Sequence, residues 1–122
     1  MSFQNMPARR DYIAVSVQVT TTPANLQALI EAILGITPGS LATLYREFQI
    51  QLDPETSGAT QVRFGNGNVG STVGGVVQKG VTLSGGGASD TIRGPVNNVM
   101  LSPVWVQAVT GTAVLNIQLW SY

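Results

Sequence analysis

The carboxylates are the side chains of this sequence best suited to acid–base or metal chemistry, because the chain contains no histidine and no cysteine. Their absence removes the commonest general base, the usual nucleophile pairs and most transition-metal ligands. Asp53 and Glu55 stand close together, but they flank Pro54 in a turn, where acidic residues commonly serve as turn formers. Asp90 follows a glycine-rich loop and is a third candidate. We predict no catalytic residue and no enzyme activity.

Two motifs could suggest a bound ion or cofactor. Asp53, Glu55 and Asp90 could bind calcium together with loop carbonyls, but their spacing does not match an EF-hand. The stretch Gly65–Gly70 has the glycine spacing of a dinucleotide fingerprint, yet no βαβ context surrounds it and the lysine of a P-loop is absent. We interpret it as a chance product of a glycine-rich loop, and predict no metal and no cofactor.

The aromatic residues near the end of the sequence have three possible roles. Trp105, Trp120 and Tyr122 lie close together, and both tryptophans fall opposite the main apolar series of their predicted strands. Exposed, they would form a sugar-binding platform. Buried between subunits, they would contribute to an interface, where aromatic residues are enriched. Burial in the domain's own core is the simplest placement.

Charge is scarce and balanced in this chain. Charged residues make up 10% of it and the net charge is zero, against about 25% charged residues in typical soluble domains. Low charge removes the repulsion that keeps monomers apart, so we predict a surface covered by neighbouring molecules. A merely uncharged soluble protein is the alternative.

The same composition argues against two classes of partner. Arg9 and Arg10 form only a pair and are followed at once by Asp11, so there is no basic patch for nucleic acid. No apolar run approaches the 18 residues or so that a membrane-spanning helix needs. The first ten residues lack the apolar stretch of a secretion signal, and we expect none.

The 122 residues suit one domain. Residues 1–11 are polar and aperiodic and predict an extended N-terminal arm, which leaves 12–122 as the domain. Residues 12–20 alternate as a strand does, with Ile13, Val15, Val17 and Val19 on one face. A short amphipathic helix is predicted over about 23–34, with Thr22 as N-cap, Pro23 as first helical residue and Gly35 as C-terminal stop; its apolar stripe is Leu26, Leu29, Ile30 and Ile33.

The remaining segments are predominantly β. Alternation predicts strands from Arg46 to Leu52 and from Thr60 to Phe64, joined as a hairpin, and a closing hairpin of residues 104–108 and 113–119. Glycine-rich loops at 65–75 and 84–89 separate short apolar pieces, and 90–93 is a candidate short strand. We predict a mainly β, single β-sandwich domain, jelly-roll-like, with one helix inserted after the first strand.

Three stretches resemble small structural proteins of tailed bacteriophages. They are Arg63-Phe64-Gly65-Asn66-Gly67, Lys79-Gly80-Val81-Thr82-Leu83, and the segment from Val104 to Ile117 with its Ala-Val-Thr-Gly-Thr-Ala centre. Among these proteins the chain is most similar to capsid decoration, or cement, proteins with β-sandwich folds. The resemblance covers roughly residues 44–120 and excludes the predicted helix and the arm.

The resemblance implies a non-enzymatic virion protein, made in the host cytoplasm and placed on the capsid surface. Such proteins commonly form trimers at local threefold axes, where they clamp neighbouring subunits of the major capsid protein. The arm would then lie over the shell or over a sister subunit, for which strand addition to a sheet edge is one route. Candidate partner-binding residues are Phe3, Met6, Arg9, Arg10, Gly65, Asn66, Gly67, Asn68, Trp105 and Trp120.

Two other functions fit the same residues. The chain could be another virion part, such as a neck, tail or fibre domain. It could also be a carbohydrate-binding β-sandwich module, which would need Trp105 and Trp120 exposed in a groove.

Overall fold

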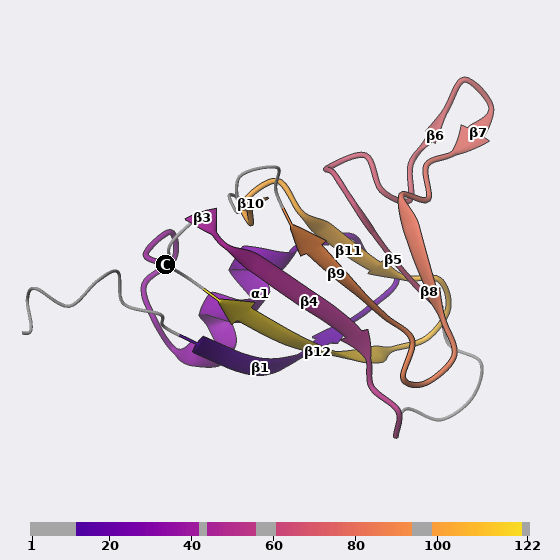
Figure 1. The fold of residues 1–122 in the computed structure, drawn as a ribbon. Coiled ribbons are helices and arrows are strands. Elements are labelled where there is room, and N and C mark those ends of the chain that lie inside the picture. Colours follow the sequence, from indigo (N-terminus) through magenta and orange to yellow (C-terminus); the bar gives the residue numbers. More distant parts are fainter. Residues whose placement is uncertain (1–11, 42–43, 56–60, 94–98, 121–122) are drawn as a thin grey trace, which may run out of the picture.

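Two four-stranded antiparallel sheets form the body of the protein in a computed structural model, which describes residues 12–41, 44–55, 61–93 and 99–120 (Figure 1). In spatial order, sheet A contains β1 (Tyr12–Val19), β12 (Ala113–Trp120), β4 (Glu47–Leu52) and β9 (Ser89–Arg93). Sheet B contains β2 (Ala24–Asn25), β11 (Trp105–Ala108), β5 (Gln61–Gly65) and β8 (Val81–Ser84). Two further pairs are β3 (Leu44–Tyr45) with β10 (Val99–Met100), and β6 (Thr72–Val73) with β7 (Val76–Val77).

The pairing of the eight sheet strands is that of a jelly roll. Taken in chain order, the first strand pairs with the last, the second with the seventh, the third with the sixth and the fourth with the fifth, so β1 joins β12 and β5 joins β8. A chain pairs its strands in this way when it forms one long antiparallel hairpin that then folds over into two sheets. The predicted β-sandwich with jelly-roll character is confirmed.

Two predicted hairpins are wrong, although their strands are present. β4 lies in sheet A between β12 and β9, whereas β5 lies in sheet B between β11 and β8. Likewise β11 and β12 belong to different sheets, and the turn around Gly111 carries the chain from one sheet to the other. Alternation identifies a strand and its buried face, but it does not identify the strand's partner.

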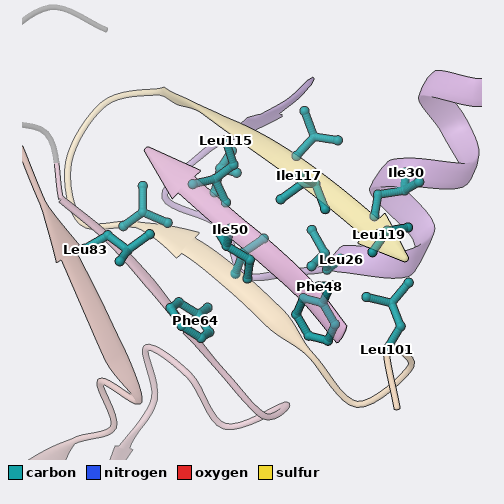
Figure 2. Packing of buried hydrophobic residues seen from close by; sticks show 14 of the residues in the cluster. Leu26, Ile30, Phe48, Ile50, Phe64, Leu83, Leu101, Leu115, Ile117 and Leu119 are labelled. Carbon is teal, nitrogen blue, oxygen red and sulfur yellow. The ribbon is translucent and has the colours of Figure 1, made fainter. Parts of the chain in front are cut away.

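The core lies between the sheets and follows the predicted alternation. Cross-strand register places Phe48, Ile50 and Leu52 of β4 opposite Leu119, Ile117 and Leu115 of β12, and all six are buried (Figure 2). Val17 and Val19 extend this layer on β1, and sheet B contributes Val62, Phe64, Leu83, Val106 and Ala108. Interdigitating side chains from two inner faces are the expected core of a sandwich.

The helix is present but begins later than predicted. α1 spans Leu26–Leu34, and its N-cap is Asn25, whose side chain accepts a hydrogen bond from the backbone N–H of Ala28 at 3.1 Å. Thr22 cannot serve as the cap because the following residues Ala24 and Asn25 form β2, which pairs with β11. Gly35 ends the helix in the left-handed conformation, as predicted.

α1 packs against β1 and β2, on the side of the sandwich where these two strands form the edges of the sheets. Leu26 and Ile30 are fully buried and Leu29 is partly buried, but Ile33 is exposed. The predicted stripe therefore packs on the core only over its first two turns.

Candidate interaction surfaces

The predicted partner-binding residues fall into separate places. Gly65 ends β5 and pairs with Trp105 of β11, and a side chain at Gly67 would lie 3.7 Å from the indole nitrogen of Trp105. The stretch 65–68 and Trp105 therefore form one surface. Trp120 lies in sheet A, with its ring 5.5 Å from that of Tyr12. The arm residues Phe3, Met6, Arg9 and Arg10 lie outside the described residues.

The stretch 65–70 is the base of a hairpin that sequence patterning missed. Asn66 accepts hydrogen bonds from the backbone of Asn68, at 2.9 Å, and of Val69, at 3.0 Å. Val69 is only 2% exposed, so it anchors this turn in the protein. The N–H of Gly70 then donates to the carbonyl of Gln78 at 2.7 Å and begins the ladder that β6 and β7 continue.

Two glycines let the base of this hairpin sit directly on sheet B. Gly80 has φ +58°, and a Cβ there would lie 2.2 Å from the carbonyl oxygen of Phe64. Gly70 has φ +85°, and a Cβ there would lie 2.5 Å from the side-chain oxygen of Gln107. Glycine is favoured at both sites by the positive φ and is required at Gly80 by the close approach of the Phe64 backbone, whereas the neighbour of Gly70 is the flexible end of the Gln107 side chain. The base of the hairpin therefore lies in close contact with β5 and β11.

Gln107 joins the hairpin base to the rest of the sandwich. Its Nε2 donates to the carbonyl of Thr21 at 3.0 Å, and its Oε1 accepts from Arg63 Nη1 at 3.3 Å. The side chain lies over Gly70 at the same time. One amide therefore connects β11, β5, the turn after β1 and the hairpin.

Beyond this base, the tip of the hairpin projects from the body of the molecule (Figure 1). The tip carries exposed apolar side chains. Val73 is 53% exposed and Val76 is 62% exposed, and they pair across the Gly74–Gly75 turn. We call Val73 and Val76 the hairpin tip. Valines flanking a Gly-Gly pair are a two-residue hairpin signature, which is the signal that could have identified this element.

A second exposed apolar group lies where α1 ends. It consists of Ile33, Leu34 and Ile36, of which Ile33 is 58% exposed; we call it the helix-end patch. The N–H groups of Gly35 and Ile36 bond to the carbonyls of Ala32 and Glu31, which closes the helix with a Schellman motif. The patch is thus held on a regular, capped helix end.

A buried carboxylate fixes the loop that follows the patch. Glu31 Oε2 accepts hydrogen bonds from the backbone N–H groups of Gly39, at 2.9 Å, and Leu41, at 3.0 Å, and from Gln27 Nε2, at 3.1 Å. The two backbone hydrogen bonds, with a smaller contribution from Gln27, hold the pKa of Glu31 below its ordinary value. Burial, and then the negative charge of Glu31, raise the pKa of the neighbouring Tyr45 to about 12. Through these hydrogen bonds, Glu31 connects α1 to the backbone of the following loop.

The outer face of sheet A is polar but almost uncharged. Ser16 donates to Asn116 Oδ1 at 2.7 Å, and Asn116 Nδ2 donates to Gln51 Oε1 at 3.2 Å, so one row of side chains is linked across three strands. An ion pair between Arg93 and Glu47, at 3.5 Å, lies on the same face. On this face, amide and hydroxyl groups interact with water in the place of the charged groups that most protein surfaces carry.

The candidate chemical residues do not converge in the described parts of the chain. Within those residues, no group of three His, Cys, Asp or Glu side chains could hold a metal ion. Asp53 follows β4 and accepts a hydrogen bond from Asn116, whereas Asp90 lies in β9 opposite Ile50. β6 follows Gly70 where a dinucleotide fingerprint would need a helix. No helix in the described ranges is long and apolar enough to cross a membrane.

Comparison with known proteins gives little further identification. No protein-family model matches the chain, and no curated protein matches it. A protein from Bacillus endospore appendages, described as a novel family of disulfide-linked pili, is similar over 93% of this chain and 88% of its own, with 17% identity and a TM-score of 0.38. A virus-like particle of the extra small virus of the prawn Macrobrachium rosenbergii is similar over 93% of this chain and 80% of its own, with 7% identity and a TM-score of 0.36. At these TM-scores neither structure establishes a function for this chain.

Proposed function

We propose that this chain is a non-enzymatic structural subunit of a virus particle. It acts as a cement protein that binds the surface of a bacteriophage capsid, as a homotrimer in contact with the major capsid protein. Binding only to the assembled shell would stabilise that state by mass action, since any ligand that prefers one state shifts the equilibrium towards it.

The main support for this proposal is the apolar hairpin tip, whose base lies in close contact with sheet B. An exposed apolar side chain on a projecting element contributes nothing to the core of its own domain, and clusters of such side chains commonly mark interaction sites. The nearly uncharged surface supports the proposal because it offers little repulsion between copies. Jelly rolls build viral capsids among other proteins, so the fold is compatible with this role.

The arm is proposed to strap a neighbouring subunit. β1 is the edge strand of sheet A, and its eight residues contain no charge and no proline. Such an edge accepts an additional strand where α1, which packs against β1, leaves its backbone open, whereas β9 at the opposite edge carries Asp90 and Arg93. Residues 1–11 of a sister copy are the proposed occupant.

The placement of the tryptophans does not favour the carbohydrate-binding alternative. Trp105 and Trp120 are both half-buried. Trp105 lies against Gly67 in sheet B and Trp120 against Tyr12 in sheet A, so the two rings belong to different surfaces. They do not combine into one sugar-binding platform.

Light scattering on the purified protein, with and without residues 1–11, tests the proposal. We expect a trimer for the whole chain and a weaker trimer after truncation, because the arm would no longer contact a sister copy. A whole chain that stays monomeric at every accessible concentration would contradict the self-association on which the proposal depends.

A further inference from the structure

The outer face of sheet A is an ordered polar surface with an aromatic pair at one end. Cross-strand register places its side chains in rows that run across β1, β12, β4 and β9. The first row begins with Tyr12 and Trp120, whose rings lie 5.5 Å apart at 46°. Tyr12 is 53% exposed and Trp120 is half-buried, so a ligand can reach both rings. Sheet A lies in front of α1 in Figure 1, so the helix does not cover this face.

The next two rows carry amides and hydroxyls and no charged side chain. The second row is Ala14, Gln118, Gln49 and Thr91, and the third row is Ser16, Asn116, Gln51 and Ser89. In the third row, Ser16, Asn116 and Gln51 already bond to one another. In the second row, the side chains of Gln118 and Gln49 form no hydrogen bond with another described residue, so both amides are open to a ligand.

A neutral sugar offers groups that complement this arrangement. Its hydroxyls donate and accept hydrogen bonds, and a side-chain amide does the same through its NH₂ group and its oxygen. The C–H groups on one face of a pyranose ring pack on the negative face of an aromatic ring. Opposite residues of neighbouring strands have Cβ atoms about 5 Å apart, and successive rows lie about 7 Å apart. A sugar stacked on the first row therefore leaves its neighbour in the glycan over the amides of the second row.

Other classes of ligand fit this face less well. The first row ends in Glu47 and Arg93, which pair at 3.5 Å and neutralise each other. The three rows thus have no net positive charge for phosphate groups. The second and third rows contain no large apolar side chain, whereas the centre of a protein interface is apolar.

We propose that the outer face of sheet A binds a neutral glycan. One sugar ring stacks on Tyr12 and Trp120, and hydroxyls of the adjoining sugar bond to the amides of the second row. Trp105 belongs to sheet B and takes no part, so this site differs from a platform of the two tryptophans. The inference goes beyond the proposed capsid role, because such a face would attach a particle to a glycan-coated surface.

Tryptophan fluorescence tests the binding. The chain has two tryptophans, so in Trp105→Phe the remaining one, Trp120, lies in the proposed site. The variant is titrated with neutral hexasaccharides of glucose, mannose, galactose and N-acetylglucosamine. We expect a saturable change in emission with at least one of them, unaffected by added sodium chloride because the ligand is uncharged. Calorimetry on the unmodified chain with the same sugars checks the affinity, and no binding to any of them in either measurement would overturn the inference.

The double variant Gln118→Ala/Gln49→Ala tests the role of the amides. It should bind the sugar at least about tenfold more weakly, because two hydrogen bonds are lost. Gln61→Ala, an exposed amide on β5 of sheet B, is the matched control and should bind as the unmodified chain does. Circular dichroism shows whether each variant is folded. Unchanged affinity in the folded double variant would overturn the proposed site.

Two further outcomes separate this inference from other uses of the face. Stronger binding to polygalacturonate, lost on adding salt, would indicate a charged ligand and overturn the neutral class. A double variant that loses the oligomer in light scattering would make the face a subunit interface and overturn the glycan site. A trimer that binds no sugar would leave the proposed function intact, whereas a monomer that binds sugar would contradict only the proposed function.

Discussion

At the scale of single residues, Glu31 links the stability of the fold to pH. Hydrogen bonds from the backbone of Gly39 and Leu41 favour its carboxylate form and lower its pKa from the ordinary value of 4.5. The unfolded chain therefore takes up this proton at a higher pH than the folded chain does. The resulting stability is complete above pH 4.5 and is lost as the pH falls from there through the folded-state pKa.

Glu31→Gln is expected to lower the melting temperature at neutral pH and to flatten its decline in acid. The amide keeps the shape of the side chain, but it cannot be a charged acceptor for two backbone N–H groups. Thermal unfolding followed by circular dichroism across this pH range measures both effects, with Glu55→Gln in an exposed turn as the control. Parallel curves for Glu31→Gln and the wild type would rule out this role.

At the scale of elements, the hairpin base depends on a close backbone approach that only glycine allows. Gly80 and Gly74 have nearly the same positive φ, +58° and +59°, but a Cβ at Gly80 would meet Phe64 whereas one at Gly74 would meet nothing within 4 Å. Comparing alanine at the two sites separates steric clash from backbone strain.

Gly74→Ala is expected to cost about 1–2 kcal/mol of hairpin stability, the usual penalty for a side chain in the left-handed region. Gly80→Ala carries the same penalty plus the clash and should cost clearly more, in total about 3 kcal/mol or above. Hydrogen exchange at the amides of Gly70 and Gln78, which form the base of the ladder, reports the opening of this element. Equal effects of the two substitutions would mean that the clash is relieved without cost.

The elements differ in how far the sequence predicts them. Strict alternation predicted β1, β4 and β12 because each has one face on the core, and Gly35 marked the end of α1. Strand partners were not predictable, since residues on either side of a turn can continue in one sheet or cross to the other. The start of α1 was wrong because pairing with Trp105 draws Asn25 into sheet B, a tertiary effect that local propensity does not contain.

The projecting hairpin and its exposed apolar tip were predicted only in part, for a related reason. The composition predicted a surface that neighbouring molecules cover. The stretch 65–68 lies in the base of the projecting hairpin. The sequence placed Val73 in a glycine-rich loop and Val76 in a short apolar piece, because a valine looks the same in sequence whether it is buried or exposed. Only the fold shows that Val73 and Val76 have no core to join.

At the scale of the whole molecule, the shortage of charge determines how association responds to solvent. The chain has few charged residues and no histidine, so the proposed self-association should be nearly constant between about pH 6 and about pH 8. Sulfate should strengthen it slightly, because excluded salts favour apolar burial. Sedimentation velocity in sodium chloride and in sulfate measures this, and a steep loss of oligomer with added salt would instead indicate a contact dominated by charge.

The pairing of β1 with β12 also affects how the protein is made. Ser16 and Asn116, hydrogen-bonded across this pair, are 100 residues apart in sequence. Translation at about 5–20 residues per second separates their appearance by about 5–20 s. During that time β1 lacks its partner strand β12. It also has no charged side chain that would discourage pairing with other chains. The strand that closes sheet A in the finished protein is therefore the one most open to wrong partners on the ribosome.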